Sequence, residues 1–233
     1  SLVGSEMCIR DRLPTGEKDP FALRRHALGI LRLLIEKELP LSLDNLIAIG
    51  TEEESVVPGV KDATEELKQF FHDRLRVMQK DQGFTAHEVK SVIGSEPAIL
   101  ADVPKRLKAV HDFMSLPEAE SLAAANKRIE NILKKNTLPL ADAVDPALLT
   151  EKEEKDLYEV IRTLEPKLEA DYKAGRYEDE LRSLAPLKAP VDAFFDKVMV
   201  NAEDEALRRN RLTLLNELHK AMNQVAKLSC LAS

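Results

Sequence analysis

The segment AAANKRIENILKKN, residues 123–136, carries the pattern that decides the fold class. Together with the leucine before it, its apolar residues recur at the spacing of one face of an α-helix. That stripe is Leu122, Ala125, Ile129, Ile132 and Leu133, and the cations Lys127, Arg128, Lys134 and Lys135 lie off it. The segment therefore predicts an amphipathic helix whose outer face is basic.

The same kind of signal recurs along the chain. Thr85 and Glu88 have the T-x-x-E spacing of a capping box, and helices are also predicted over about 62–81, 117–135, 151–174 and 204–228. Runs that alternate with period two between hairpin turns are missing, so strands are not expected. The segments 51–59 and 136–146 are linker candidates. The prediction is an all-α helical bundle with antiparallel neighbours.

Composition limits the classes of function. The 233 residues carry a formal net charge of −7, so any binding of nucleic acid must depend on a local basic patch. Cys8 and Cys230 lie near opposite ends and form no CxxC pair, which fits a reducing compartment. The apolar run 27–35 is interrupted by Arg32, and a bilayer span needs about 20 apolar residues. No membrane association is expected.

A second basic cluster lies in EDEALRRNRLTLLNEL, residues 203–218, and comprises Arg208, Arg209 and Arg211. Three arginines so close together exceed what a helix dipole requires, and the guanidinium fork suits phosphate. The alternative is that both clusters are solvated helix faces. The acidic stretch 151–180 would repel a phosphate backbone, so RNA is not expected there.

Motifs for nucleotide binding or hydrolysis are missing from the chain. The one enzyme-like hint is a repeated His-Asp dipeptide, His72-Asp73 and His111-Asp112. Imidazole and carboxylate together suit a divalent metal that activates water, so an HD-type metal-dependent phosphohydrolase is an alternative function. A local ion pair between Asp73 and Arg76 explains the first dipeptide equally well. No catalytic or metal-binding residue is assigned.

Longer segments then resemble one family in the correct order. FFDKVMVNAEDEALRRNRLTLL (194–215), LAAANKRIENILKK (122–135), YEDELRSLAPLKAPVDAFFDKVMV (177–200), GEKDPFALRRHALGILRLLIE (16–36) and FFHDRLRVMQKDQGFTAHEVKSVIG (70–94) are similar to the C-terminal part of bacterial glycyl-tRNA synthetase beta subunits. The motif Asp-Ala-Leu-Arg reads Glu205-Ala206-Leu207-Arg208 here, and Lys227 stands where an acidic residue is expected.

The resemblance implies a domain organisation. Residues 13–115 would be the C-terminal part of an HD-like core helical region that has lost metal chemistry, and 116–233 a DALR-type anticodon-binding domain. Residues 1–12, SLVGSEMCIRDR, show no periodicity and are interpreted as a non-native, adapter-derived tail.

The resemblance also implies a function: recognition of the anticodon of tRNA(Gly) within a cytoplasmic glycine–tRNA ligase. This chain would hold no cofactor, and the alpha subunit would bind ATP, Mg²⁺ and glycine. The partners would be tRNA(Gly), the alpha subunit and a second beta subunit in an alpha2-beta2 tetramer. A further alternative is a helical interaction module without an RNA role.

Under this interpretation the basic residues would position phosphates, and two asparagines would read base edges. The predicted tRNA-binding residues are Asn126, Lys127, Arg128, Lys134, Lys135, Arg208, Arg209, Asn210 and Arg211.

Overall fold

The computed structural model describes residues 22–54 and 63–232, except for the side chains of 51–54. The predicted tail 1–12 and residues 55–59 of the linker candidate 51–59 lie outside the described residues. Within them all regular secondary structure is helical and there is no strand, apart from one isolated antiparallel bridge between Ser42 and Ile99. The all-α prediction is confirmed. The helices of the described residues are too short or too polar to cross a membrane.

The chain divides into two compact units, each described by itself. The first contains residues 1–89 and 96–104, and the second contains 90–95 and 105–233. The boundaries therefore fall within helix α5 (Ala86–Ile93), after Ser95, and at the start of helix α6 (Val103–Phe113), whereas the predicted domain boundary lies at 115/116. The assignment of domains stays a prediction.

The first unit is built around α4. Its helices α2 and α3 both pack against α4, and α2 also contacts the short helix η1. Leu31, Leu67, Phe71 and Leu75 are fully buried between them. The bounds are α2 Leu23–Glu36, α3 Leu43–Glu54, α4 Thr64–Asp81, α5 Ala86–Ile93 and η1 Leu100–Asp102. Helix α3 therefore includes the first four residues of the linker candidate 51–59.

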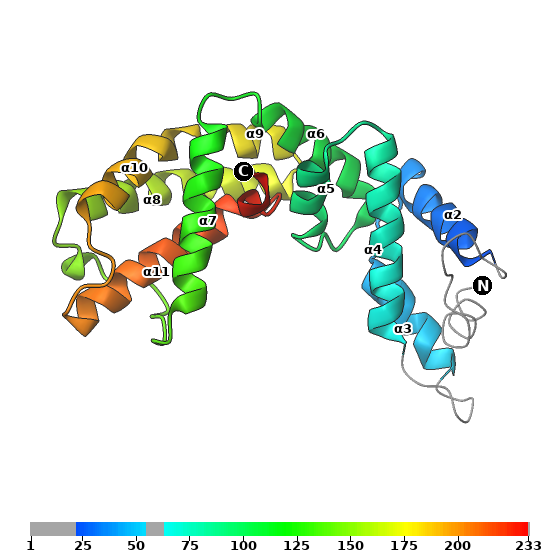
Figure 1. Ribbon diagram of the computed structural model, residues 1–233, viewed down its shortest axis with the longest axis horizontal. Helices are drawn as coiled ribbons and strands as arrows, with labels where there is room; N and C mark the ends of the chain where they lie inside the picture. The colour runs from blue at the N-terminus through cyan, green and yellow to red at the C-terminus, as the bar shows by residue number, and fades with distance from the viewer. Residues whose placement is uncertain (1–21, 55–62, 233) are drawn as a thin grey trace. The chain divides into compact units, whose positions relative to one another are not determined.

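The second unit is a bundle in which α7 packs against α10, α11 and the C-terminal helix η4, and α8 packs against α9, α10 and α11 (Figure 1). The bounds are α6 Val103–Phe113, α7 Ala119–Lys135, η2 Pro146–Leu148, α8 Lys152–Lys173, α9 Tyr177–Arg182, η3 Ala185–Leu187, α10 Lys188–Lys197, α11 Glu205–Met222 and η4 Leu228–Leu231. Helix α11 ends six residues before the predicted end, and η4 follows it.

Local signals explain several of these boundaries. The capping box at Thr85 and Glu88 forms both of its hydrogen bonds, 2.7 Å and 3.2 Å long. Helix α8 ends at Lys173, and Gly175, two residues further on, has a φ of 69°, in the left-handed region. There the amide of Arg176 donates to the carbonyl of Asp171, which is the long bond of a Schellman motif.

The second linker candidate, 136–146, is not a loose connection. Its backbone follows α11 and is held by side chains of that helix: Thr213 accepts from the amide of Ala141, and Asn210 accepts from the amide of Asp145. Val144 is buried. These contacts fix the segment that joins α7 to α8.

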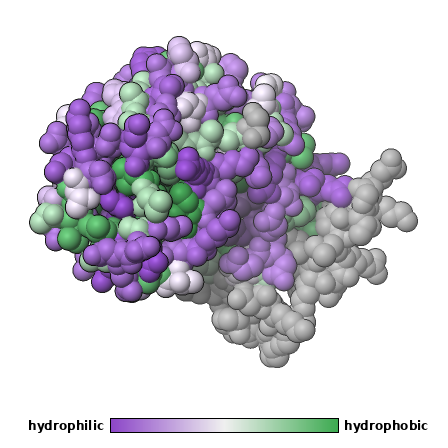
Figure 2. Space-filling model, turned by 60° about the vertical axis from the view of Figure 1, so that its left-hand side comes forward, coloured by the Kyte–Doolittle hydropathy of each residue, from purple (hydrophilic) through white to green (hydrophobic). Residues whose placement is uncertain are grey.

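Figure 2 brings forward the side that lies to the left in Figure 1, and hydrophilic side chains cover most of that face.

Candidate nucleic-acid interface

The outer face of α7 carries a shallow groove. Lys127, Arg128, Asn131 and Lys135 line it together with Ala124 and Ile132, and its volume is about 360 Å³. Each of these residues has another member of the set three or four positions away along the helix, so they share one face by helix geometry. The predicted basic face of this helix therefore exists as a concave strip with cations on it.

Neighbouring groups orient the cations of this strip. The guanidinium of Arg128 lies 4.1 Å from the centre of the Phe195 ring, a cation–π arrangement between α7 and α10. The Lys127 ammonium donates to the carbonyl of Ala232 at 3.4 Å. Lys135 is exposed and forms no ion pair with any residue that the structure describes. Its charge is therefore available to an anion from outside.

A second cavity, of about 420 Å³, continues the groove past the end of α7. It shares Ile132 and Lys135 with the groove and is completed by Asn136, Thr137, Leu138, Asn201, Arg208 and Leu212. Lys135 and Arg208 come from the two separate basic clusters of the sequence, and the fold brings them to one cavity. None of the described residues that line the groove or the cavity carries a carboxylate. We call Lys127, Arg128, Asn131, Lys135, Thr137, Asn201 and Arg208 the basic groove.

Lys134 faces away from the basic groove. Its ammonium lies 2.6 Å from the Glu130 carboxylate, which also pairs with Lys227 at 3.1 Å. Burial alone would raise the pKa of Glu130, but hydrogen bonds from Lys134, Ser229 and Lys227 outweigh it and hold the pKa at about 2. Lys134 is therefore neutralised within the protein. The contact with Glu130 also accounts for a lysine at position 227.

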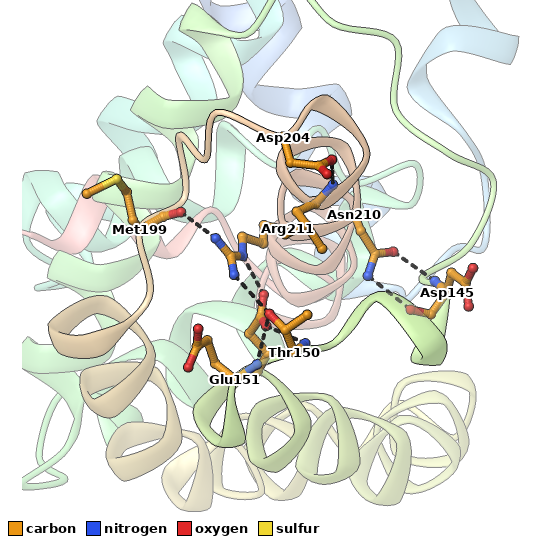
Figure 3. Close-up of polar contacts among 9 residues, drawn as sticks. Asp145, Thr150, Glu151, Met199, Asp204, Asn210 and Arg211 are labelled. Atoms are coloured by element: carbon orange, nitrogen blue, oxygen red, sulfur yellow. Dashed lines mark hydrogen bonds and ion pairs between the residues drawn. The ribbon is translucent and has the colours of Figure 1, made fainter.

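Two of the predicted base readers, Asn126 and Asn210, are buried, and their role in reading bases stays a prediction. Asn126 is fully buried on α7, where its amide nitrogen approaches the Met222 sulfur at 3.8 Å. Asn210 is 3% exposed and forms a pair of hydrogen bonds with the backbone of Asp145, 2.8 Å and 3.0 Å long (Figure 3). Neither side chain reaches the surface, so neither can meet a base edge in this conformation.

Arg211 is also an interior residue. Its guanidinium donates to the carboxylate of Glu154, to the carbonyl of Met199 and to the hydroxyl of Thr150 (Figure 3). Burial favours the neutral form of Glu154 and is the largest single influence, yet the hydrogen bonds from Arg211, the Glu151 backbone and Thr150, together with the charge of Arg211, outweigh it and lower the pKa of that carboxyl. Each of the three guanidinium nitrogens of Arg211 thus has a partner within the protein, and the residue links α11 to α8.

Arg209 is exposed but lies outside the basic groove. It lines a separate cavity of about 630 Å³ with Asp142, Asp145 and Glu205, and it donates to the carbonyl of Leu140. Carboxylates at this cavity oppose a phosphate. The N-terminus of α11 is capped within the protein, because the side chain of Asp204 accepts hydrogen bonds from the backbone amides of Ala206 and Leu207.

Two of the tyrosines and the first His-Asp dipeptide have local partners. The rings of Tyr172 and Tyr177 pack on the buried guanidinium of Arg106, which donates to the Tyr172 hydroxyl at 2.9 Å. Asp73 accepts from Arg76 at 2.6 Å, as the local interpretation predicted. Within 22–54 and 63–232, no group of three or more His, Cys, Asp or Glu side chains is placed to hold a metal ion.

Asn131, Thr137 and Asn201 line the basic groove but were not predicted from the sequence. Asn131 could have been identified, since it lies one turn from Lys127 and Lys135 on the same face. Thr137 and Asn201 precede or follow helices in irregular segments, so their approach to the groove depends on long-range packing.

Comparison with known proteins defines the class first. Residues 122–229 match the family model described as the DALR anticodon binding domain, so the C-terminal part is a helical domain of the anticodon-binding class. Residues 3–94 match the model described as the glycyl-tRNA synthetase beta subunit.

Relatives agree with both matches. The glycine–tRNA ligase beta subunit of Delftia acidovorans is 53% identical over 225 residues, which cover 95% of this chain and 31% of that protein. The beta subunit of Dechloromonas aromatica is 50% identical over 244 residues, covering 100% of this chain and 34% of its own length. The chain belongs to the family of glycyl-tRNA synthetase beta subunits, and the resemblance seen in the sequence is confirmed. It spans about a third of the length of these relatives.

Proposed function

We propose that the basic groove binds the anticodon arm of a tRNA. The observation that carries this proposal is the meeting of Lys135 and Arg208 at one cavity that continues the cationic face of α7. Lysine and arginine neutralise phosphates, and amide or hydroxyl groups between them contact sugars and bases. The match of residues 122–229 to an anticodon-binding domain supports this assignment.

The family gives the proposal its biological setting. In the whole protein this chain would serve a glycine–tRNA ligase, which attaches glycine to tRNA(Gly) at the expense of ATP. The alpha subunit would bind ATP, Mg²⁺ and glycine, and two beta subunits would assemble with two alpha subunits. The chain described here would bind the anticodon arm and would supply no group that takes part in the chemical step.

The experiment measures binding of the purified chain to a bacterial tRNA(Gly) transcript across a range of salt concentrations. A transcript with a changed anticodon is measured in parallel. We expect affinity to fall steeply with salt, because each phosphate contact releases counterions, and to fall when the anticodon is changed. Binding that is weak, insensitive to salt and equal for both transcripts would overturn the proposal.

Matched variants localise the site. Lys135→Gln removes a charge from the basic groove, whereas Lys155→Gln removes the same charge from an exposed position on the acidic helix α8. We expect the first variant to reduce the salt dependence by about one unit of log–log slope and the second to leave it unchanged. Equal effects of the two variants would mean that only net charge matters.

A further inference from the structure

The cavity at the end of α7 differs from the rest of the basic groove in its walls. Ile132, Leu138 and Leu212 give it an apolar lining, and Leu212 is only 2% exposed. Asn136 shapes one wall. Its side-chain nitrogen donates to the backbone carbonyl of Leu138 at 2.7 Å, and its side-chain oxygen accepts from the backbone N–H of Leu138 at 2.9 Å. Apolar walls do not stabilise a bound phosphate, whereas they do stabilise a flat heterocycle, whose faces are apolar.

The polar groups of this cavity are not saturated within the protein. The Nε of Arg208 is buried and has no hydrogen-bond partner among the residues that the structure describes. Arg211, one turn further along α11, has protein partners for each of its three nitrogens. A buried donor without a partner is unusual, and an acceptor supplied by a ligand is one remedy. Thr137 and Asn201 are exposed on the same cavity and form no hydrogen bond with described residues.

We propose that this cavity receives one unstacked nucleobase of the bound RNA, and that Arg208 reads it by donating a hydrogen bond to an acceptor on its edge. The inference rests on the proposed function and assigns the specificity of that site to a residue. Apolar side chains cover the faces of the base, while Thr137 and Asn201 meet its polar edge at the rim. Single-stranded RNA is read in this manner, by bases that leave the stack and enter a pocket.

The first experiment compares Arg208→Lys with Arg209→Lys. Both keep the charge and remove the Nε donor, but Arg209 lies outside the basic groove. Binding is measured to tRNA(Gly) transcripts that differ at one unpaired anticodon-loop position at a time. We expect Arg208→Lys to lose roughly tenfold in discrimination at one position, with little change in salt dependence, and Arg209→Lys to behave as wild type. Unchanged discrimination in Arg208→Lys would overturn the inference.

A second measurement needs no variant. The chain contains no tryptophan, so the emission of 2-aminopurine placed at each loop position can be followed directly. None of the described lining residues is aromatic, so a base that enters the cavity loses its stacking partners and becomes brighter. If no loop position brightens on binding, the inference is wrong. If the RNA shows no salt-dependent binding at all, the proposed function itself is wrong, and the inference about the cavity falls with it.

Discussion

Arg211 on α11 and Glu154 on α8 form a buried ion pair, with 2.5 Å between the arginine Nε and the glutamate Oε1. The second oxygen of Glu154 accepts from the amides of Thr150 and Glu151, which are 2.9 Å and 2.8 Å away. The pair therefore joins two helices and also caps the start of α8. Because almost every polar atom in it has a partner, removal of one member leaves the other charged and buried.

We expect Arg211→Met to lower the free energy of unfolding by about 3–5 kcal/mol, the usual cost of leaving a buried charge without its partner. Chemical denaturation followed by circular dichroism measures the change. Arg209→Met on the same helix should stay within about 0.5 kcal/mol, since that side chain is exposed. The double variant Arg211→Met with Glu154→Gln should recover part of the loss. Equal stability of the two single variants would contradict the structural role of Arg211.

The contact of Asn210 with Asp145 gives a second prediction. Asn210→Ala removes both hydrogen bonds to the backbone of Asp145 and should lower the free energy of unfolding by about 1–3 kcal/mol. The Asp145 amide should also exchange its hydrogen faster, because it loses its acceptor. Asn216→Ala, at a half-buried position on α11, is the control. Unchanged exchange at Asp145 would show that α11 does not hold the segment 136–146.

The positions of these polar residues show what the sequence could and could not predict. Asn126 lies four residues after Leu122 and three before Ile129, which places it on the apolar stripe of α7. Arg211 lies four residues after Leu207 and three before Leu214. Helical periodicity therefore already indicated burial. Their residue types, which are common at RNA interfaces, favoured the surface, and the predicted contact with RNA followed that preference rather than the periodicity.

Other features depended on packing between distant segments. The helical class and most helix bounds followed from periodicity and caps, as at Thr85 and Glu88. The position of Lys135 and Arg208 at one cavity could not be predicted in this way, because it depends on how α7 and α11 pack against each other. The sequence likewise gave no sign that the segment 136–146 would be fixed by Thr213 and Asn210, since side chains of α11 supply those hydrogen bonds.

Glu180 predicts a dependence of stability on pH. Its side chain is fully buried on α9, and burial raises its pKa to about 8, although the nearby charge of Arg106 opposes the shift and that of Asp171 adds to it. The folded state therefore binds a proton that the unfolded state releases near the ordinary pKa of a glutamate, 4.5. Stability contributed by the protonated group is complete below that value and is lost as pH rises towards 8.

Glu180→Gln should remove this dependence. We expect the variant to be more stable than wild type near pH 8 and to approach wild type near pH 5, with unfolding midpoints measured across that range. Glu178→Gln, on the same helix but paired at the surface with Arg182, should follow the wild-type profile. Parallel profiles of wild type and Glu180→Gln would mean that the carboxyl is ionised in the folded protein.

The last prediction separates the position of a charge from its presence. The guanidinium of Arg128 lies over the ring of Phe195, which holds it at the basic groove. Phe195→Leu keeps an apolar side chain but removes the ring, so about 0.5–1 kcal/mol of cation–π attraction is lost while the charge remains. We expect affinity for a tRNA(Gly) transcript to fall about two- to fivefold with an unchanged salt slope. Arg128→Gln should reduce both the affinity and the slope, the latter by about one. If Phe195→Leu binds as wild type does, orientation by the ring contributes nothing to binding. If it instead reduces the slope, Arg128 has left the groove altogether, and the ring determines where the charge lies.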